Sequence, residues 1–145
     1  MFKNFLISMI FVMGTVGITT SSMAEENHYH DNMHEIDHHL KNFKSAKDSK
    51  EARAALQSMQ KSVEVCQKNL PSGLQKLKSK DAKVTAYQGL LTDLLKEIKQ
   101  AEQFVAANQL TKAQTLTVKM DQIKKQGHQA FKSVSYTHLR AHETR

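Results

Sequence analysis

The stretch VTAYQGLLTDLLKEIKQAEQFV, residues 84–105, decides the fold class of this 145-residue chain. Its apolar residues recur at alternating intervals of three and four, from one end of the stretch to the other. Such spacing places a continuous apolar stripe on one face of a helix, and helices of this kind pack side by side at shallow angles. The members of the stripe are Val84, Tyr87, Leu91, Leu94, Ile98, Ala101 and Val105.

Three other segments carry shorter stripes with the same spacing, so the sequence predicts four helices. The stripes are Met33, Ile36, Leu40 and Phe43; Ala52, Leu56, Met59, Val63 and Cys66; and Ala113, Leu116, Met120 and Ile123. The expected helices cover residues 28–45, 49–69, 82–107 and 111–132.

Polar residues at the expected helix starts support these boundaries. Asp48 is followed three residues later by Glu51, the spacing of a capping box. Asp81 and Thr111 are residue types that cap helix N-termini, and we expect both to do so.

The lengths of the joins predict the topology. Those at 46–48 and 108–110 are short, so the helices on either side of each should be antiparallel neighbours. The join at 70–81 is longer, rich in lysine and contains the only proline. With one proline and five glycines, a sheet of many strands is excluded. We predict an all-α protein, an antiparallel up-down-up-down four-helix bundle.

The two ends of the chain differ in character from the middle. Residues 1–24 combine Lys3, an uncharged apolar run at 5–18 and the small-residue site Ser22-Met23-Ala24, which predicts a cleaved export signal and a periplasmic protein without stable membrane insertion. The last residues, 134–145, resemble the translation of a sequencing-library adapter, so we interpret them as a non-native tail. The predicted functional domain is 25–133.

Composition excludes several kinds of site. Residues 25–132 hold 18 Lys and Arg against 13 Asp and Glu, a net charge of +5, with one close run of lysines at positions 76, 78, 80 and 83. No aromatic residues interleave with these charges to stack on bases, so a solvated surface is favoured over a nucleic-acid site. Cys66 is the single cysteine, which excludes an intrachain disulfide. Its place on a stripe predicts a buried side chain.

Four short segments resemble the soluble periplasmic cytochrome b562 family, and the resemblance extends over residues 25–132. They are Asp31-Asn32-Met33, Ala54-Ala55-Leu56-Gln57-Ser58-Met59, Lys112-Ala113-Gln114 and Gly127-His128-Gln129. The resemblance implies one non-covalent b-type haem per chain, with Met33 and His128 as axial iron ligands. In the predicted topology these two residues lie at the same end of the bundle and at similar depth.

The implied ligand pair predicts an electron carrier and not an enzyme. A thioether and an imidazole fill both axial positions and raise the reduction potential, which leaves no open site for a substrate. Covalent attachment is excluded, because a CxxCH motif ending at His128 would need cysteines where Lys124 and Gly127 stand. We expect Tyr87 and Leu91 to contact the haem and Lys124 to reach a propionate. We also expect a monomer whose partners are redox proteins, acidic ones in view of the net +5.

Two alternatives from other classes remain open. Five histidines at positions 28, 30, 34, 38 and 39 crowd the start of the first helix. Of these, His34 and His38 are one helical turn apart and could share a weakly bound Zn, Cu or Ni ion, as in a haem-free bundle that buffers or senses metal. The segment Leu110-Thr111-Lys112-Ala113-Gln114 matches an LTxxQ pattern of periplasmic stress chaperones, which is the third interpretation.

Overall fold

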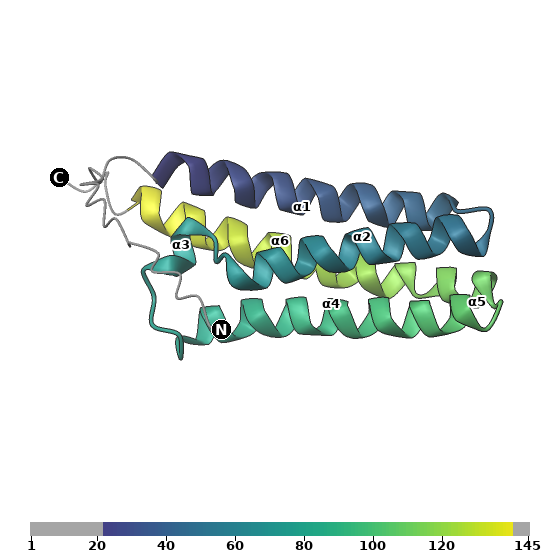
Figure 1. Ribbon diagram of the computed structural model, residues 1–145. Helices are drawn as coiled ribbons and strands as arrows, with labels where there is room; N and C mark the ends of the chain where they lie inside the picture. Colours follow the sequence, from purple (N-terminus) through teal and green to yellow (C-terminus); the bar gives the residue numbers. More distant parts are fainter. Residues whose placement is uncertain (1–21, 141–145) are drawn as a thin grey trace, which may run out of the picture.

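The computed structural model describes residues 22–140, with the side chains of residues 32–130. Within this range all regular structure is helical, and four long helices run alternately up and down (Figure 1). The predicted all-α four-helix bundle is confirmed. The long helices are α1 (Ser22–Ser45), α2 (Ser49–Lys68), α4 (Ala82–Ala106) and α6 (Thr117–Arg140), and the short ones are α3 (Ser72–Gln75) and α5 (Leu110–Thr115).

The predicted terminal segments are largely beyond this range. Residues 1–21, which hold most of the expected export signal, and residues 141–145 lie outside the described part of the chain. Of the expected tail, residues 134–140 are described only as backbone, where they continue α6.

The four apolar stripes form the core. Every residue of the 84–105 stripe is buried, and so is every residue of the stripe on α2, including Cys66. Burial of a large aliphatic side chain contributes about 1.5–3 kcal/mol, so these stripes are the main source of stability. On α1, Ile36, Leu40 and Phe43 are fully buried, whereas Met33 is only half-buried near the end of the bundle.

Two of the three predicted caps are confirmed. The Asp48 carboxylate accepts a hydrogen bond from the backbone N–H of Glu51 at 2.8 Å, and the Glu51 carboxylate accepts one from the N–H of Lys47 at 2.9 Å. At the start of α4, the Asp81 carboxylate accepts from the N–H of Lys83 at 2.8 Å. Each carboxylate satisfies a donor that the helix itself leaves unpaired.

The prediction that Thr111 caps a helix is wrong. The helix begins one residue earlier, at Leu110, and no side chain caps it. The chain reverses instead through Asn108, which has a φ of 58°. The N–H of Gln109 donates to the carbonyl of Phe104 at 2.8 Å, which closes α4 in a Schellman-type end. Asn tolerates this left-handed conformation better than most residues.

The expected fourth helix is also interrupted at Leu116, which separates α5 from α6. The hydroxyl groups of Thr115 and Thr117 donate to the carbonyls of Lys112 and Gln114, at 2.6 and 2.7 Å. Hydroxyls that bond back to the preceding turn in this way bend helices, which accounts for the break.

Gln114, the last residue of the LTxxQ pattern, has a structural role. Its side-chain amide donates to the carbonyl oxygens of Phe43 at 3.1 Å and Ala46 at 2.9 Å. These carbonyls belong to the C-terminal end of α1, where the helix provides no partner for them. Gln114 therefore caps α1 and ties it to α5, which explains a glutamine here without a chaperone function.

The long join at 70–81 is partly ordered as α3. Pro71 and Leu74 are buried and anchor this join to the core. Figure 1 shows α3 at the end of the bundle where α1 begins and α6 ends.

We expect Asp48→Ala to lower the free energy of unfolding by about 1 kcal/mol, because the N–H of Glu51 loses its partner at the start of α2. Urea denaturation followed by circular dichroism measures the change. Asp93→Ala is the matched control, since Asp93 is exposed in the middle of α4 and caps nothing. Equal stability of Asp48→Ala and the parent protein would show that the cap contributes nothing.

Candidate functional site

An apolar pocket lies between α1, α4 and α6, toward the end of the bundle that carries α3. Its cavity measures about 20 Å³. α4 provides the largest share of the lining, and one of the lining residues is a methionine. The lining residues are Met33, Ile36, Tyr87, Leu90, Leu91, Leu94, Ile123, Lys124 and Gly127.

The structure brings together four of the five residues predicted to bind a cofactor. Met33, Tyr87, Leu91 and Lys124 all line the pocket, although they come from three helices. The fifth, His128, is exposed and is not part of the lining. His128 directly follows Gly127, the last lining residue of α6. It also stands one helical turn after Lys124, so the Cα–Cβ bonds of Lys124 and His128 leave α6 on the same face.

Three lining residues were not predicted as site residues. Ile36 and Ile123 belong to the apolar stripes. Their periodicity predicts that they are buried, but it does not show which buried residues line a pocket. Leu90 lies off the stripe of α4 and is only half-buried, so no sequence pattern singles it out. The side chain of Gly127 is a hydrogen, and a Cβ built there would meet Leu90 Cδ1 at 4.0 Å, ordinary contact distance.

Lys124 contributes its aliphatic chain to the pocket and its charge to the seam between α1 and α6. Its ammonium group forms an ion pair with Asp37 of α1 and another with Asp121, at 3.4 Å. Asp37 also pairs with Lys41 at 2.8 Å. Hydrogen bonds from Lys124 and then Lys41 lower the pKa of Asp37 from 3.8 to about 2.

A second ion pair, between Lys44 and Asp121, crosses the same seam. Burial alone would raise the pKa of Asp121, but the hydrogen bond from Lys44 and the one from Lys124 lower it below the usual value. Among the long helices, α1 packs mainly against α2, and α6 packs mainly against α4. The ion pairs of Lys44 and Lys124 are side-chain contacts that connect α1 directly to α6.

Two of the described side chains in and next to this pocket are iron-binding types. Met33 lines the pocket with a soft thioether side chain, and His128, the residue after Gly127, carries an exposed imidazole outside the lining. Burial, followed by the negative charge of Glu35, raises the pKa of the Cys66 thiol to about 11, so this sulfur stays protonated near neutral pH. A thioether and an imidazole among aliphatic side chains are the ligand set of a low-spin haem iron.

Comparison with known families identifies the family of this chain. A family model described as cytochrome b562 matches residues 28–132, which include both Met33 and His128. The chain belongs to the cytochrome b562 family. Cytochromes of this family are haem-binding electron carriers and not typical enzymes, and they are typically periplasmic. A search of curated proteins found no match to this chain.

No helix that the structure describes within residues 22–140 has the length and apolar character needed to cross a bilayer.

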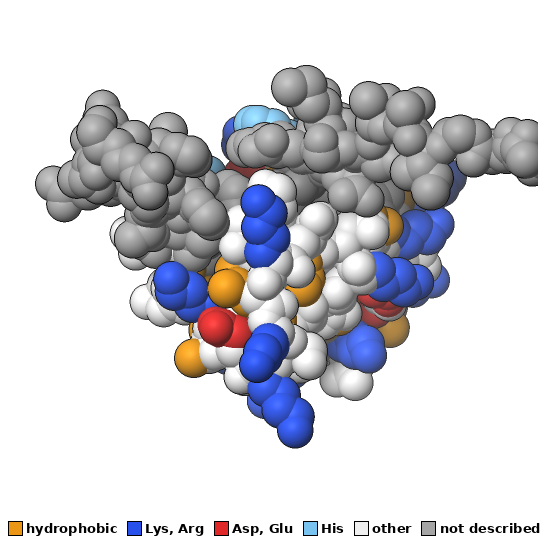
Figure 2. Space-filling view, turned by 90° about the vertical axis from the view of Figure 1, so that its left-hand side faces the viewer, with side chains coloured by type: hydrophobic (Ala, Val, Ile, Leu, Met, Phe, Trp, Pro, Cys, Tyr) orange, Lys and Arg blue, Asp and Glu red, His pale blue; other side chains and the backbone are white. Residues whose placement is uncertain are grey.

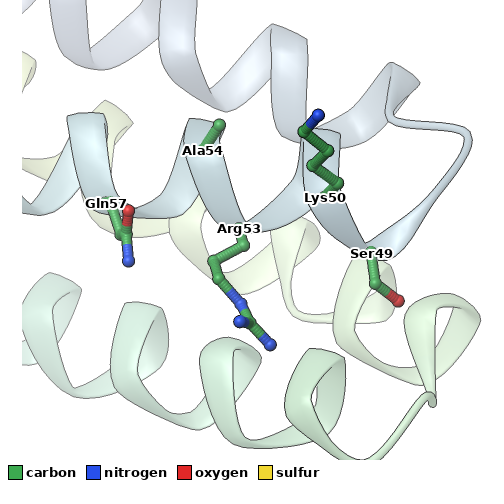
Figure 3. Close-up of a pocket in the computed structure, with 5 residues that line it drawn as sticks. All are labelled: Ser49, Lys50, Arg53, Ala54 and Gln57. Carbon is green, nitrogen blue, oxygen red and sulfur yellow. The ribbon is translucent and has the colours of Figure 1, made fainter.

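A shallow surface hollow on α2 is the other candidate site in this cytochrome b562 relative. Its lining consists of Ser49, Lys50, Arg53, Ala54 and Gln57, all from one helix (Figure 3). Arg53 and Gln57 point toward α4, whereas Lys50 extends the other way. The lining offers neither a thioether nor an imidazole, so the hollow does not suit haem, and the pocket beside Met33 is the better candidate.

The secondary metal site predicted at His34 and His38 stays a prediction. Both side chains are exposed on α1. His38 is close to Asn42, with 3.2 Å between its Nε2 and the amide nitrogen, and its ring meets that of His39 edge-on at 5.6 Å. Among the described side chains, no group of three or more His, Cys, Asp or Glu residues could hold a metal ion.

We expect the Asp37 ion pairs to make stability depend on pH. Because the pKa of Asp37 falls from 3.8 to about 2 on folding, its contribution is complete above pH 4 and disappears as the pH falls toward 2. Asp37→Asn should lower the free energy of unfolding at pH 7 by about 1 kcal/mol, the upper range for a partly exposed pair. Urea denaturation at pH 7, 4 and 2 measures this.

The difference between Asp37→Asn and the parent protein should be mostly lost at pH 2. Asp93→Asn serves as the control, because Asp93 is exposed and forms no ion pair with a described residue. A difference that persists unchanged at pH 2 would contradict the ion-pair explanation.

For His34 and His38 we expect weak binding of Cu(II), stronger than that of Zn(II), as the Irving–Williams order requires. Binding should fade below about pH 6, because protonated imidazole cannot ligate. Calorimetric titration of Cu(II) into the parent protein and a His34→Ala/His38→Ala variant measures this, with His39→Ala as control. Equal affinity in the parent and the double variant would show that these two histidines form no site.

Proposed function

We propose that this member of the cytochrome b562 family binds one b-type haem non-covalently in the pocket between α1, α4 and α6. Met33 and His128 would be the axial ligands. The protein would carry single electrons in the periplasm as a monomer, with other redox proteins as partners. The observation that carries the proposal is the half-buried thioether of Met33 within an apolar pocket, whose last α6 residue, Gly127, directly precedes a histidine.

The side chains that line the pocket have the chemistry that haem binding requires. Tyr87, Leu91 and Leu94 supply an aromatic and two aliphatic walls, and each is less than a tenth exposed. Such walls keep water away from the bound group and thereby help to set its redox potential. When bound, haem supplies an Fe(III)/Fe(II) couple.

The pocket must widen to accept a porphyrin, since a cavity of about 20 Å³ has room for little more than one water molecule. The side chains and the helix pair that would have to move apart, around Met33 and between α1 and α6, can do so at low cost. Met33 and Leu90 are flexible, half-buried side chains. The α1–α6 seam depends on the surface ion pairs of Lys44 and Lys124, which can re-form with other partners more easily than core contacts can be broken.

His128 can reach the pocket without loss of other contacts. No described residue forms a hydrogen bond with its imidazole, and Gly127 beside it presents no side chain to obstruct the ring. Rotation of the exposed side chain toward Met33 therefore breaks no interaction within the described part of the chain. Lys124, one turn earlier, would exchange Asp37 for a haem propionate, a partner of the same charge.

Titration of haemin into the purified protein tests the proposal. We expect one equivalent to bind and the reduced protein to show the sharp, split visible bands of a six-coordinate low-spin haem. Met33→Ala should remain able to bind haem but become high-spin. His128→Ala should bind more than about tenfold more weakly, because even groups that only support a ligand contribute that much to metal affinity.

Two matched variants control for folding and for the residue type. Met59→Leu changes a buried methionine of α2 outside the pocket, and His38→Ala removes an exposed histidine of α1. Both should keep the parent spectrum. Unaltered spectra in Met33→Ala and His128→Ala would show that these residues are not the ligands, and a protein that takes up no haem would exclude the proposed function.

A further inference from the structure

The positive charge of this protein is concentrated in one segment. Residues 65–92 contain five lysines and one acidic residue, Asp81, a net charge of +4. Residues 25–132 as a whole have a net charge of +5. Nearly all of the excess charge therefore lies in the connection between α2 and α4 and in the segments on either side of it.

Four of these lysines form a positive surface that includes a single acidic residue, Asp81, and we call these four lysines the loop-end cluster: Lys76, Lys78, Lys80 and Lys83. All four are exposed, and none forms an ion pair with a described residue. In contrast, Lys41, Lys44 and Lys124 on the α1–α6 seam are all paired with aspartates. The one nearby acid, Asp81, uses its carboxylate to accept a hydrogen bond from the N–H of Lys83 at the start of α4.

The loop-end cluster lies beside the candidate haem pocket. Lys83 is one turn before Tyr87 on α4, and Tyr87 lines the pocket. Residues one turn apart on a helix have Cβ atoms about 5–6 Å from each other. Figure 2 shows this end of the bundle, where blue Lys and Arg side chains extend over the described part of the face with few red acidic ones between them.

We propose that the loop-end cluster is the docking surface for an acidic redox protein. This rests on the proposed function, because a docking surface for electron transfer must lie close to the redox centre. Complementary charge would orient the partner with its acidic face against this end of the bundle and increase the rate of encounter. Residues 25–64 have a net charge of −2 and residues 93–132 one of +3, so the segment that holds the loop-end cluster is the most positive of the three.

An acidic protein fits this surface better than a nucleic acid or a membrane. Among the described aromatic residues, Tyr87 is the one that follows the cluster on α4, and its side chain is buried, so it presents no ring for stacking on bases. The apolar residues of the connection, Leu70, Leu74 and Leu77, are half-buried or buried in the core, so none is available to insert into lipid. Lysines are strongly hydrated point charges, which suits a transient complex with carboxylates.

The test compares two haem-loaded variants with the same change in net charge. One carries Lys76→Gln, Lys78→Gln, Lys80→Gln and Lys83→Gln. The matched control carries Lys47→Gln, Lys50→Gln, Lys96→Gln and Lys99→Gln, which are exposed lysines away from the loop end. The probe is a reduced plant-type [2Fe–2S] ferredoxin with an acidic surface, and stopped-flow absorption measures the second-order rate of electron transfer.

We expect the loop-end variant to react about tenfold more slowly than the parent at low ionic strength, within the range that electrostatic steering supplies. The control should change less than about twofold. The parent rate should fall steeply as salt is added, and the loop-end variant should lose most of this dependence. Equal slowing of both variants would overturn the proposal, because net charge alone would then explain the effect.

Two further measurements distinguish a failure of haem binding, and binding to a membrane, from a failure of the docking proposal. The absorption spectrum of each variant reports haem binding before the kinetics, so failure of the proposed function is seen there and not in the rate. Sedimentation with phosphatidylglycerol vesicles tests the membrane alternative. Vesicle binding that the loop-end substitutions abolish, together with an unchanged rate toward ferredoxin, would replace the acidic protein by a membrane and overturn the proposal.

Discussion

Burial of one apolar stripe per helix is the constraint on which the rest of this structure depends. A helix with such a stripe cannot leave it in water, because each large aliphatic side chain contributes about 1.5–3 kcal/mol when buried. The stripe of residues 84–105 is buried along its whole length and gives α4 a central place against both α2 and α6. The caps, turns and ion pairs influence how the helices pack, but burial of the apolar stripes is what drives the helices to associate.

The pocket lies where this packing leaves a small cavity. Along most of the bundle the stripes interdigitate, but near the α3 end Met33 and Leu90 are only half-buried, and a small cavity lies beside them. Beside the pocket, α1 and α6 are joined by the ion pair between Lys124 and Asp37, and the pair between Lys44 and Asp121 joins them toward the opposite end of α1. An interface held by partly exposed charges costs less to open than one held by interdigitated leucines. The ion pair of Lys124 thus lies where the cofactor is proposed to bind.

Charge is divided between two tasks in this protein. Lysines on the seam are paired with aspartates and contribute to holding α1 and α6 together, and Lys119 pairs in the same way with the buried Glu97 of α4. The loop-end lysines have no such partners among the described residues and leave a positive surface at the end of the bundle. The same residue type therefore forms ion pairs in one place and is proposed to attract a partner in another, and the difference depends on whether an acidic residue faces it.

Local sequence determined the helices, their order and two of their caps, because periodicity and the Asp48 and Asp81 hydrogen bonds act within a few residues. The family resemblance, and not the local pattern, suggested Met33, Tyr87, Leu91, Lys124 and His128 as cofactor-binding residues, and the first four line one pocket. The local pattern failed at Thr111 and did not foresee the break at Leu116, since Asn108 and the threonine hydroxyls offered competing local hydrogen bonds. Only the tertiary structure decided that Leu90 lines the pocket, that Lys124 pairs with Asp37 and that Gln114 caps α1, because each contact joins residues distant in the chain.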